Sequence, residues 1–261
     1  MPFDSTGKIS LDHVYTAPDP RPFCGVLREL DYQMPQLAKP YLAKLIEERG
    51  TPTVLDVGCS YGVNAALYRH DATMDDLYAH YTAEEAAGLD RAGLIARDRA
   101  LPVANDVRFI GLDVSAPALD YACAAGFLDA AVCADLEHDD PTDEQRALLA
   151  EADLVVSTGC IGYVSERTIV RIAQPRRPAM AHFVLRMFSY APIAESLAGL
   201  GYRTAGVEGV FKQRRFASAD EQEQILDAVR ANGLEPHEFE TEGWLCAQLY
   251  LSSPADPRGH Q

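Results

Sequence analysis

The chain has 261 residues, 48% of them hydrophobic, and its 39 acidic residues outnumber its 23 basic ones to give a formal net charge of −16. This length and apolar content suit one large α/β domain with a substantial core. Nucleic-acid binding depends on a cationic surface, so the acidic balance argues against a DNA or RNA partner.

The sequence also argues against a membrane protein and against a cysteine-based framework. No apolar run approaches the ~18 residues that cross a bilayer, and the N-terminus lacks a basic and apolar signal segment. The six cysteines are scattered, with no C-x-x-C pair. We therefore expect neither disulfides nor a metal site, and a soluble protein of the reducing cytoplasm.

The first 50 residues are predicted to form a cap region ahead of the main domain. Residues 1–10 carry no element pattern and are expected to be unstructured. A helix over about 36–48 then leads into the first strand.

Residues 54–62 read Val-Leu-Asp-Val-Gly-Cys-Ser-Tyr-Gly, an apolar run that ends in an acid and a glycine turn. Such a run is typical of a strand buried on both faces. The glycines let the chain reverse sharply and bring backbone N–H groups close to a ligand. A helix start follows at 64–68, and strand, loop and helix in this order build the nucleotide pocket of open α/β sheets.

The pattern Asp56-x-Gly58-x-Ser60-x-Gly62 resembles motif I of the class I, seven-strand S-adenosylmethionine-dependent methyltransferases, with serine at the middle glycine. The NAD fingerprint fits worse, and a P-loop worse still because no Gly-Lys-Ser/Thr occurs. The alternative is an ordinary glycine turn after a buried strand. The resemblance covers about residues 51–253 and implies S-adenosylmethionine as cofactor, bound by Asp56, Gly58, Cys59, Ser60 and Gly62.

An insertion over residues 69–106 separates the first helix from the second strand. Asp56 and Asp113 are 57 residues apart, whereas a compact unit places the second acid about 20 residues on. Long insertions tend to be functional lids, so we expect a lid here. Tyr78 and Tyr81 share one helical face, which is more typical of packing than of a substrate cage. The insertion would equally suit a homodimer interface.

Three further strands end in polar residues, over 107–115, 129–136 and 152–159. A carboxylate at the tip of the second strand is placed to accept hydrogen bonds from both ribose hydroxyls. The resemblance gives this role to Asp113, with Val114 beside it. It also assigns the adenine amino group to Asp135 and the ring to the backbone of Leu136, and the fourth strand is expected to point Ser157 into the same crevice.

Strands over 180–188, 203–211 and 244–251 complete the expected fold, a doubly wound, mostly parallel seven-stranded sheet. A helix that begins at Ser218, with Glu221 in a capping box, would interrupt the last strand pair. Residues 51–253 then form the Rossmann-like domain, and 254–261 form a tail.

In the resembled family an N-terminal layer often lies over the cofactor. Arg21, Tyr32 and Gln33 are therefore candidates for contacts to the methionine carboxylate or to the substrate, although Tyr32 has packing against the sheet as an equal alternative. The loop 159–165 faces the transferred group in the family. Tyr163 is thus the candidate catalytic and substrate-binding residue, orienting substrate or contacting the sulfonium through its ring.

The function predicted from these features is S-adenosylmethionine-dependent methyl transfer to a small molecule, in specialised metabolism. No histidine sits in a diagnostic motif, and His182 is expected to be a core histidine. The pocket motifs contact only the adenosine half of the cofactor. Aminocarboxypropyl transfer or cyclisation with release of methylthioadenosine therefore stays open, as does a non-catalytic binding or assembly protein.

Overall fold

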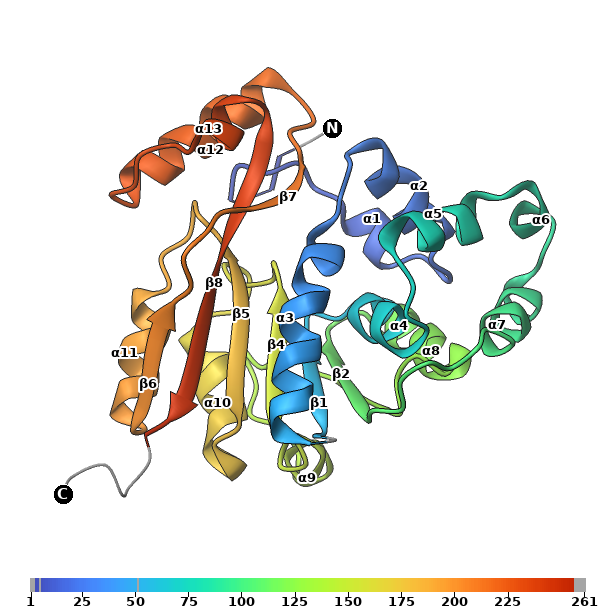
Figure 1. Cartoon of the computed structure of the whole chain (residues 1–261), viewed down its shortest axis with the longest axis horizontal. Helices are drawn as coiled ribbons and strands as arrows, with labels where there is room; N and C mark the ends of the chain where they lie inside the picture. Colours follow the sequence, from blue (N-terminus) through green and yellow to red (C-terminus); the bar gives the residue numbers. More distant parts are fainter. Residues whose placement is uncertain (1–2, 5, 51, 256–261) are drawn as a thin grey trace.

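A computed structural model describes residues 3–4, 6–50 and 52–255 (Figure 1). The elements run in the order α1 (Asp12–Tyr15), α2 (Arg21–Glu29), α3 (Met34–Arg49), β1 (Val54–Val57), α4 (Val63–Arg69), α5 (Met74–Thr82), α6 (Glu84–Ala87), α7 (Arg91–Arg99), β2 (Phe109–Asp113), α8 (Ala116–Ala125), β3 (Ala130–Cys133), α9 (Asp143–Leu149), β4 (Leu154–Thr158), α10 (Glu166–Arg176), β5 (Ala179–Leu185), α11 (Ala191–Gly199), β6 (Tyr202–Gly206), β7 (Phe211–Arg215), α12 (Ala219–Ala231), α13 (Glu238–Thr241) and β8 (Trp244–Pro254).

One eight-stranded sheet organises the molecule, in the order β3-β2-β1-β4-β5-β8-β6, with β7 also paired to β8. Strands β1 to β5 run parallel, and β8 is antiparallel to β5, β6 and β7. The predicted doubly wound class I methyltransferase-like sheet is confirmed. Its strand order reverses between β1 and β4, and such a reversal opens a ligand crevice at the carboxyl ends of the strands.

The sheet differs from the expected seven strands because the segment predicted as one strand over 203–211 folds as two. Gly209 adopts a φ of 123° between β6 and β7, a conformation that favours glycine. The two short strands pair with opposite halves of the long strand β8, β6 from Tyr202↔Pro254 and β7 from Phe211↔Ala247. The helical insertion predicted before the last strand is present as α12 and α13.

Helices cover both faces of the sheet. One core cluster joins the strands to buried residues of α3, α8 and α12, and another joins them to α9, α10 and α11. Strand positions on both faces are apolar because parallel sheets are buried on both sides. Within the part of the chain described, none of the helices has the length and apolar character to cross a membrane.

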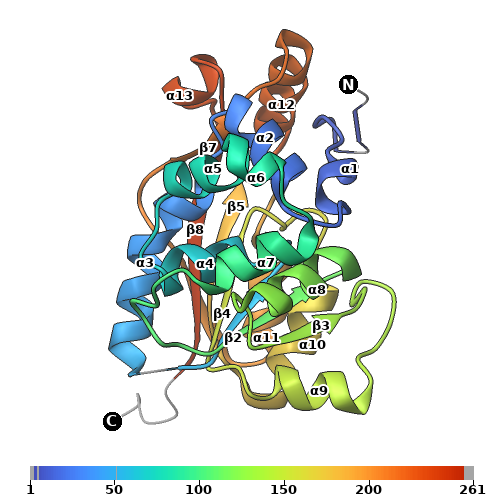
Figure 2. The same ribbon diagram turned by 90° about the vertical axis from the view of Figure 1, so that its right-hand side faces the viewer.

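The insertion over 69–106 folds into α5, α6 and α7, outside α4 and α8 (Figure 2). Helix α5 packs on α2, and α7 packs on α8. The fully buried carboxylate of Asp98 in α7 joins them: it accepts hydrogen bonds from the hydroxyls of Tyr81 (2.7 Å) and Tyr121 (2.6 Å) and lies 2.7 Å from His80 Nε2. Tyr78 and Tyr81 are buried, so they serve packing as predicted.

The expectation that residues 1–10 are unstructured is wrong for the part of this segment that is described, residues 3–4 and 6–10. Lys8 and Ile9 are buried, and Phe3 bridges Ile9. The Ile9 N–H donates to Glu221 Oε1 at 2.8 Å. Glu221 thereby departs from its predicted capping box: Ser218 caps its N–H, but its carboxylate binds elsewhere.

Replacement of Asp98 by alanine should lower the free energy of unfolding by about 2–4 kcal/mol, because two buried tyrosine hydroxyls and His80 lose their shared partner. Urea unfolding measures the change. Glu85→Ala, on the exposed side of the same insertion, is the control and should stay within about 0.5 kcal/mol of the parent. Equal stability of the two variants would contradict the linking role of Asp98.

Candidate functional site

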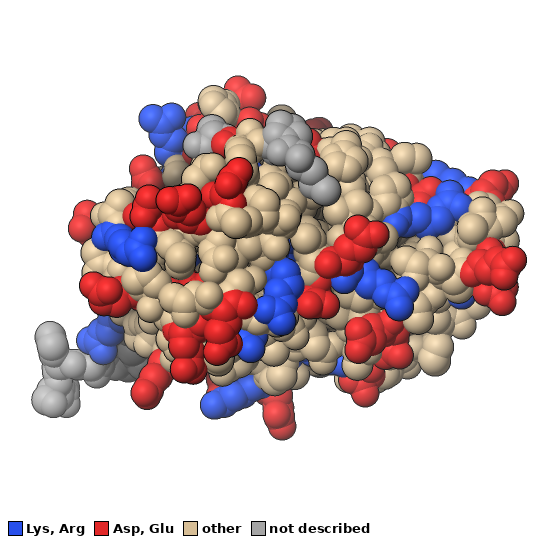
Figure 3. All heavy atoms as spheres, turned by 90° about the horizontal axis from the view of Figure 1, so that it is seen from above, with Lys and Arg blue, Asp and Glu red and all other residues tan. Residues whose placement is uncertain are grey.

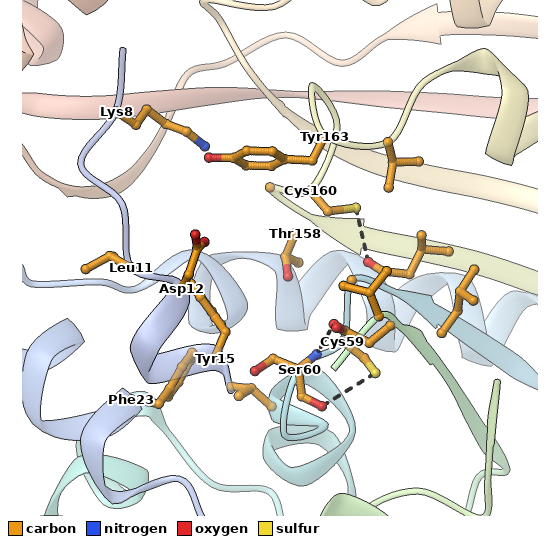
Figure 4. A pocket seen from close by; sticks show the side chains of 18 of the residues that line it. Lys8, Leu11, Asp12, Tyr15, Phe23, Cys59, Ser60, Thr158, Cys160 and Tyr163 are labelled. Atoms are coloured by element: carbon orange, nitrogen blue, oxygen red, sulfur yellow. Dashed lines mark hydrogen bonds between the residues drawn. The ribbon is translucent and has the colours of Figure 1, made fainter. Parts of the chain in front are cut away.

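A cavity of about 440 Å³ lies at the carboxyl ends of β1, β2, β3 and β4, within the size range of small-molecule sites. The turn after β1 and the ends of β2 and β3 form its lower wall, and the loop after β4 forms its upper wall. Residues of α1 and α2 line the side away from Cys160, as Asp12, Tyr15 and Phe23 show in Figure 4. Tyr32 also lines the cavity. None of residues 69–106, all of which are described, lines it, so the insertion predicted as a lid instead supports α2.

The turn after β1 follows a path that only particular backbone conformations allow. Gly58 has a φ of 67°, and a Cβ there would lie 2.5 Å from Cβ of Cys160, so the turn can approach the β4 loop only with glycine. Ser60, at the motif's middle glycine position, has a φ of 49°, a left-handed conformation that costs a non-glycine residue energy. Gly62 caps α4 in the left-handed region and shapes the turn without lining the cavity.

Asp113 holds this turn in place. Its Oδ2 accepts from the Ser60 N–H at 2.8 Å, and its Oδ1 accepts from the Ser115 N–H at 2.9 Å. Each carboxylate oxygen has a second acceptor position, so Asp113 can still receive two hydroxyl groups from a ligand. Val114, 69% exposed, follows it on the cavity wall.

The end of β3 supplies the other predicted contacts. Asp135 and Leu136 both line the cavity, as do Gly58, Cys59 and Ser60. Asp135 lies 2.9 Å from His138 Nδ1, and the hydrogen bond from His138 lowers the pKa of the Asp135 carboxyl. This strand end therefore presents an ionised acceptor next to the buried Leu136 side chain.

Asp56 lies beneath the cavity and does not line it. Asn64 Nδ2 donates to Asp56 Oδ1 at 3.0 Å and contacts Thr158 Oγ1 at 3.0 Å. Burial raises the pKa of Asp56 to about 7 against the opposing effect of the Asn64 hydrogen bond. Asn64 and Thr158 are the residues that reach the cavity, and the sequence reasoning missed both. The position of Asn64 in the first turn after the glycine motif was the available signal.

Ser157, predicted to face the cavity, does not line it. Successive strand side chains point to opposite faces, so Thr158 faces the cavity and Ser157 faces the core. Ser157 is fully buried, and its Oγ lies 2.8 Å from His182 Nδ1. Burial lowers the pKa of His182 to about 4, and this histidine is a neutral core residue as expected.

Two of the three predicted N-terminal contact residues also lie elsewhere. Tyr32 lines the cavity, but Gln33 does not: its N–H donates to the carbonyl of Gln213 at 2.8 Å, and Gln213 lines the cavity instead. Arg21 binds Asp19 and the Leu89 carbonyl at 2.9 Å, so it braces α2 against the insertion.

The upper wall contains Tyr163, which was predicted, and Lys8, which the sequence reasoning missed. The Tyr163 hydroxyl donates to Asp4 Oδ2, and Lys8 Nζ lies 4.2 Å from the centre of the Tyr163 ring. Arg214 lines the same region and is paired with Glu221 at 2.7 Å. The apolar spacing of Ile9, Leu11 and Val14 was the only signal that this segment packs.

Two buried polar atoms on the cavity wall lack a partner among the described residues, Ser60 Oγ and Gln213 Oε1. Buried polar groups are normally hydrogen-bonded, and an exception needs an explanation. A polar ligand in the cavity would satisfy both atoms. On the face seen in Figure 3, Lys and Arg side chains are interspersed with Asp and Glu and form no single basic patch.

The sequence matches no protein-family profile and no curated protein. The chain is similar to the magnesium protoporphyrin IX methyltransferase of Synechocystis PCC 6803, solved with bound S-adenosylmethionine, at 13% identity and a TM-score of 0.44 over 85% of this chain and 79% of that one.

Two more solved structures are similar to it. A TehB-like methyltransferase of Corynebacterium glutamicum gives 15% identity and a TM-score of 0.40 over 80% of this chain and 85% of that one. A ribosomal protein L11 methylase of Lactobacillus delbrueckii gives 15% identity and 0.39 over 83% and 79%. At these identities and TM-scores, the similarities assign no activity to this chain, and function is argued from the site itself.

The raised pKa of Asp56 predicts a pH-dependent stability. The folded state holds the Asp56 proton more tightly than the unfolded chain, in which the pKa is near 3.8. Stability is therefore lost as the pH rises from about 4 to about 7 and changes little above that. Asp56→Asn removes this loss and keeps an acceptor for Asn64. The free energy of unfolding of the variant, relative to that of the parent, should therefore increase by on the order of 2–4 kcal/mol over this pH range.

Urea unfolding at a series of pH values measures this advantage. Asp120→Asn, on the exposed side of α8, is the matched control. An advantage of Asp56→Asn that stays constant with pH, or one that Asp120→Asn reproduces, would contradict the assignment of the effect to Asp56.

Proposed function

We propose that the protein is an S-adenosylmethionine-dependent methyltransferase that acts on a small molecule. The observation that carries the proposal is the juxtaposition, on one cavity wall, of the strained turn after β1 and the carboxylates that end β2 and β3. Backbone N–H groups, a carboxylate for hydroxyl groups and an acceptor beside an apolar side chain are the groups that an adenosine needs.

Each part of the wall has a role in holding the cofactor. Asp113 would receive the ribose hydroxyls, and Asp135 the adenine amino group. Val114 and Leu136 would flank the ring with apolar surface. The turn Gly58–Ser60 would face the amino-acid part, where Ser60 Oγ gains its missing partner.

The remaining walls favour a small acceptor. The sulfonium of the bound cofactor supplies an already activated methyl group, so the protein mainly aligns the reactants and excludes water. The N-terminal segment and α2 enclose the space in front of the β4 loop, which leaves room for a metabolite and not for a polymer. Tyr163, on that loop, is the proposed substrate-orienting residue, and Tyr32, which also lines the cavity, is proposed as a second substrate contact.

Product analysis tests the reaction. Purified protein is incubated with S-adenosylmethionine alone and then with a cell-extract metabolite pool, and the products are identified by mass spectrometry. S-adenosylhomocysteine that forms only with the extract is the expected result. Methylthioadenosine without a second substrate would replace methyl transfer by cyclisation or aminocarboxypropyl chemistry, and no product together with no binding would overturn the proposal.

Replacement of Asp113 by alanine should weaken binding of S-adenosylhomocysteine by about 1–3 kcal/mol, or roughly 5- to 150-fold, because the ribose hydroxyls and the Ser60 N–H lose their acceptor. Isothermal titration calorimetry measures the dissociation constant. Asp120→Ala, seven residues further along in α8 and exposed, is the control and should bind as the parent does. Unchanged binding in Asp113→Ala would mean that the cofactor lies elsewhere.

A further inference from the structure

We propose that Lys8 is the general base of this site and that the methyl acceptor is a protic group, a hydroxyl or an amine, which gives up its proton to Lys8. This inference rests on the proposed methyl transfer and adds to it a catalytic residue and a class of acceptor. Among the described residues that the N-terminal segment contributes to the cavity wall, Lys8 is the one with a cationic side chain.

Lys8 occupies an uncommon environment for a lysine. It is 7% exposed, lines the cavity, and places Nζ 4.2 Å from the Tyr163 ring centre and 5.7 Å from that of Phe188. Figure 4 shows its amine directed towards Tyr163, above the space that Asp12 and Thr158 enter from below. Among the described residues Lys8 forms no salt bridge, whereas Lys39 and Lys44 pair with Asp71 and Glu48. Lys212 also lies over aromatic rings without a salt bridge in the described part of the chain, but it does not line the cavity.

The charges around Lys8 come from four parts of the chain. Burial lowers its pKa to about 8, and the positive charge of Arg214 on β7 acts in the same direction. Asp4 on its own loop, Glu221 on α12 and Cys160 after β4 oppose this decrease. An amine in this range is neutral often enough near neutral pH to accept a proton, and a general base works best when its pKa lies near the working pH.

The neighbouring groups are less suited to this role. Tyr163 already donates its proton to Asp4, and burial and this hydrogen bond raise the pKa of the phenol, so it stays neutral. The Glu137 carboxylate accepts from Ser165 and Thr168. Asp12 also enters the cavity, but its side chain on α1 is largely exposed to solvent, and it is tested below. His138 lines the cavity at the end of β3, where it is bonded to Asp135 on the side proposed for the adenine.

The proposed step is balanced without a further reactant. A lone pair of the acceptor oxygen or nitrogen forms the bond to the methyl carbon as the methyl–sulfur bond breaks and leaves its electron pair on sulfur. The acceptor's proton passes to the lone pair of Lys8 Nζ. The ammonium so formed lies over the Tyr163 ring face, where it is stabilised by the cation–π interaction.

The first test needs no substrate. Lys8 is one of four lysines in the chain, so protein labelled with ¹³C at lysine Cε gives few NMR signals, and the signal absent from Lys8→Arg is that of Lys8. A titration midpoint near 8 supports the proposal. A midpoint near 10 or above, as in a solvated lysine, overturns it.

The second test compares turnover of variants with the metabolite extract as acceptor pool. Lys8→Arg keeps the charge but cannot accept a proton, so it should lower S-adenosylhomocysteine formation at pH 8 by about 100-fold or more, at unchanged S-adenosylhomocysteine binding. Lys44→Arg, outside the cavity, should behave as the parent. Lys8→Arg turnover within about threefold of the parent, or a loss found only in Asp12→Asn, overturns the assignment.

The two proposals fail in different ways. A parent protein that binds no S-adenosylhomocysteine refutes the proposed function, whatever Lys8 does. Binding and turnover that survive in Lys8→Arg refute the role of Lys8 alone. Circular dichroism of each variant separates these outcomes from loss of folding.

Discussion

The buried carboxylate of Glu221 fixes the N-terminal segment beside the cavity. It accepts from the Ile9 and Ala217 N–H groups, each at 2.8 Å, and from both Nη atoms of Arg214 at 2.9 and 2.7 Å. With four donors around one carboxylate, hydrogen bonds to Arg214 lower the Glu221 pKa although burial opposes this, and the group stays ionised. Removal of such a buried group leaves its partners unsatisfied, which is why it fixes one arrangement of the chain.

This one contact joins the two ends of the sequence over the sheet. The N-terminal segment brings Lys8 and Asp4 to the cavity, and β7 brings Gln213 and Arg214 from the other side. The insertion does not line the cavity but supports α2, which does, because α5 packs on α2. Asp98 in turn links α7 to α8. The side of the cavity proposed for the methyl acceptor is thus built from the N-terminal segment and β7, and the side proposed for the cofactor from the ends of the parallel strands.

Charged side chains of both signs line the cavity of this acidic protein, whose net charge is −16. Lys8 and Arg214 line it near Asp4, whereas Asp113 and Asp135 lie at the ends of β2 and β3. Under the proposed function, a nucleoside would meet hydrogen-bond acceptors on one wall, and a proton leaving the methyl acceptor would meet the Lys8 amine on the other. Because these charges are partly buried, dissolved salt screens their interactions less than it screens those of charges on the exposed surface.

The sequence by itself determined the parallel sheet, the turn after β1 and the acids at Asp113 and Asp135, because apolar runs, turn glycines and strand-end residues are local signals. The sequence analysis chose Ser157 where Thr158 lines the cavity. Because strand side chains alternate between faces, an error of one residue selects a side chain on the opposite face of the sheet. Only the tertiary structure decided how the N-terminal segment lies over the cavity. Ile9 and Glu221 are 212 residues apart in sequence, and no local sequence pattern predicts a contact between residues so far apart. Lys8 acquires its properties from that contact, since burial and not residue type sets its pKa.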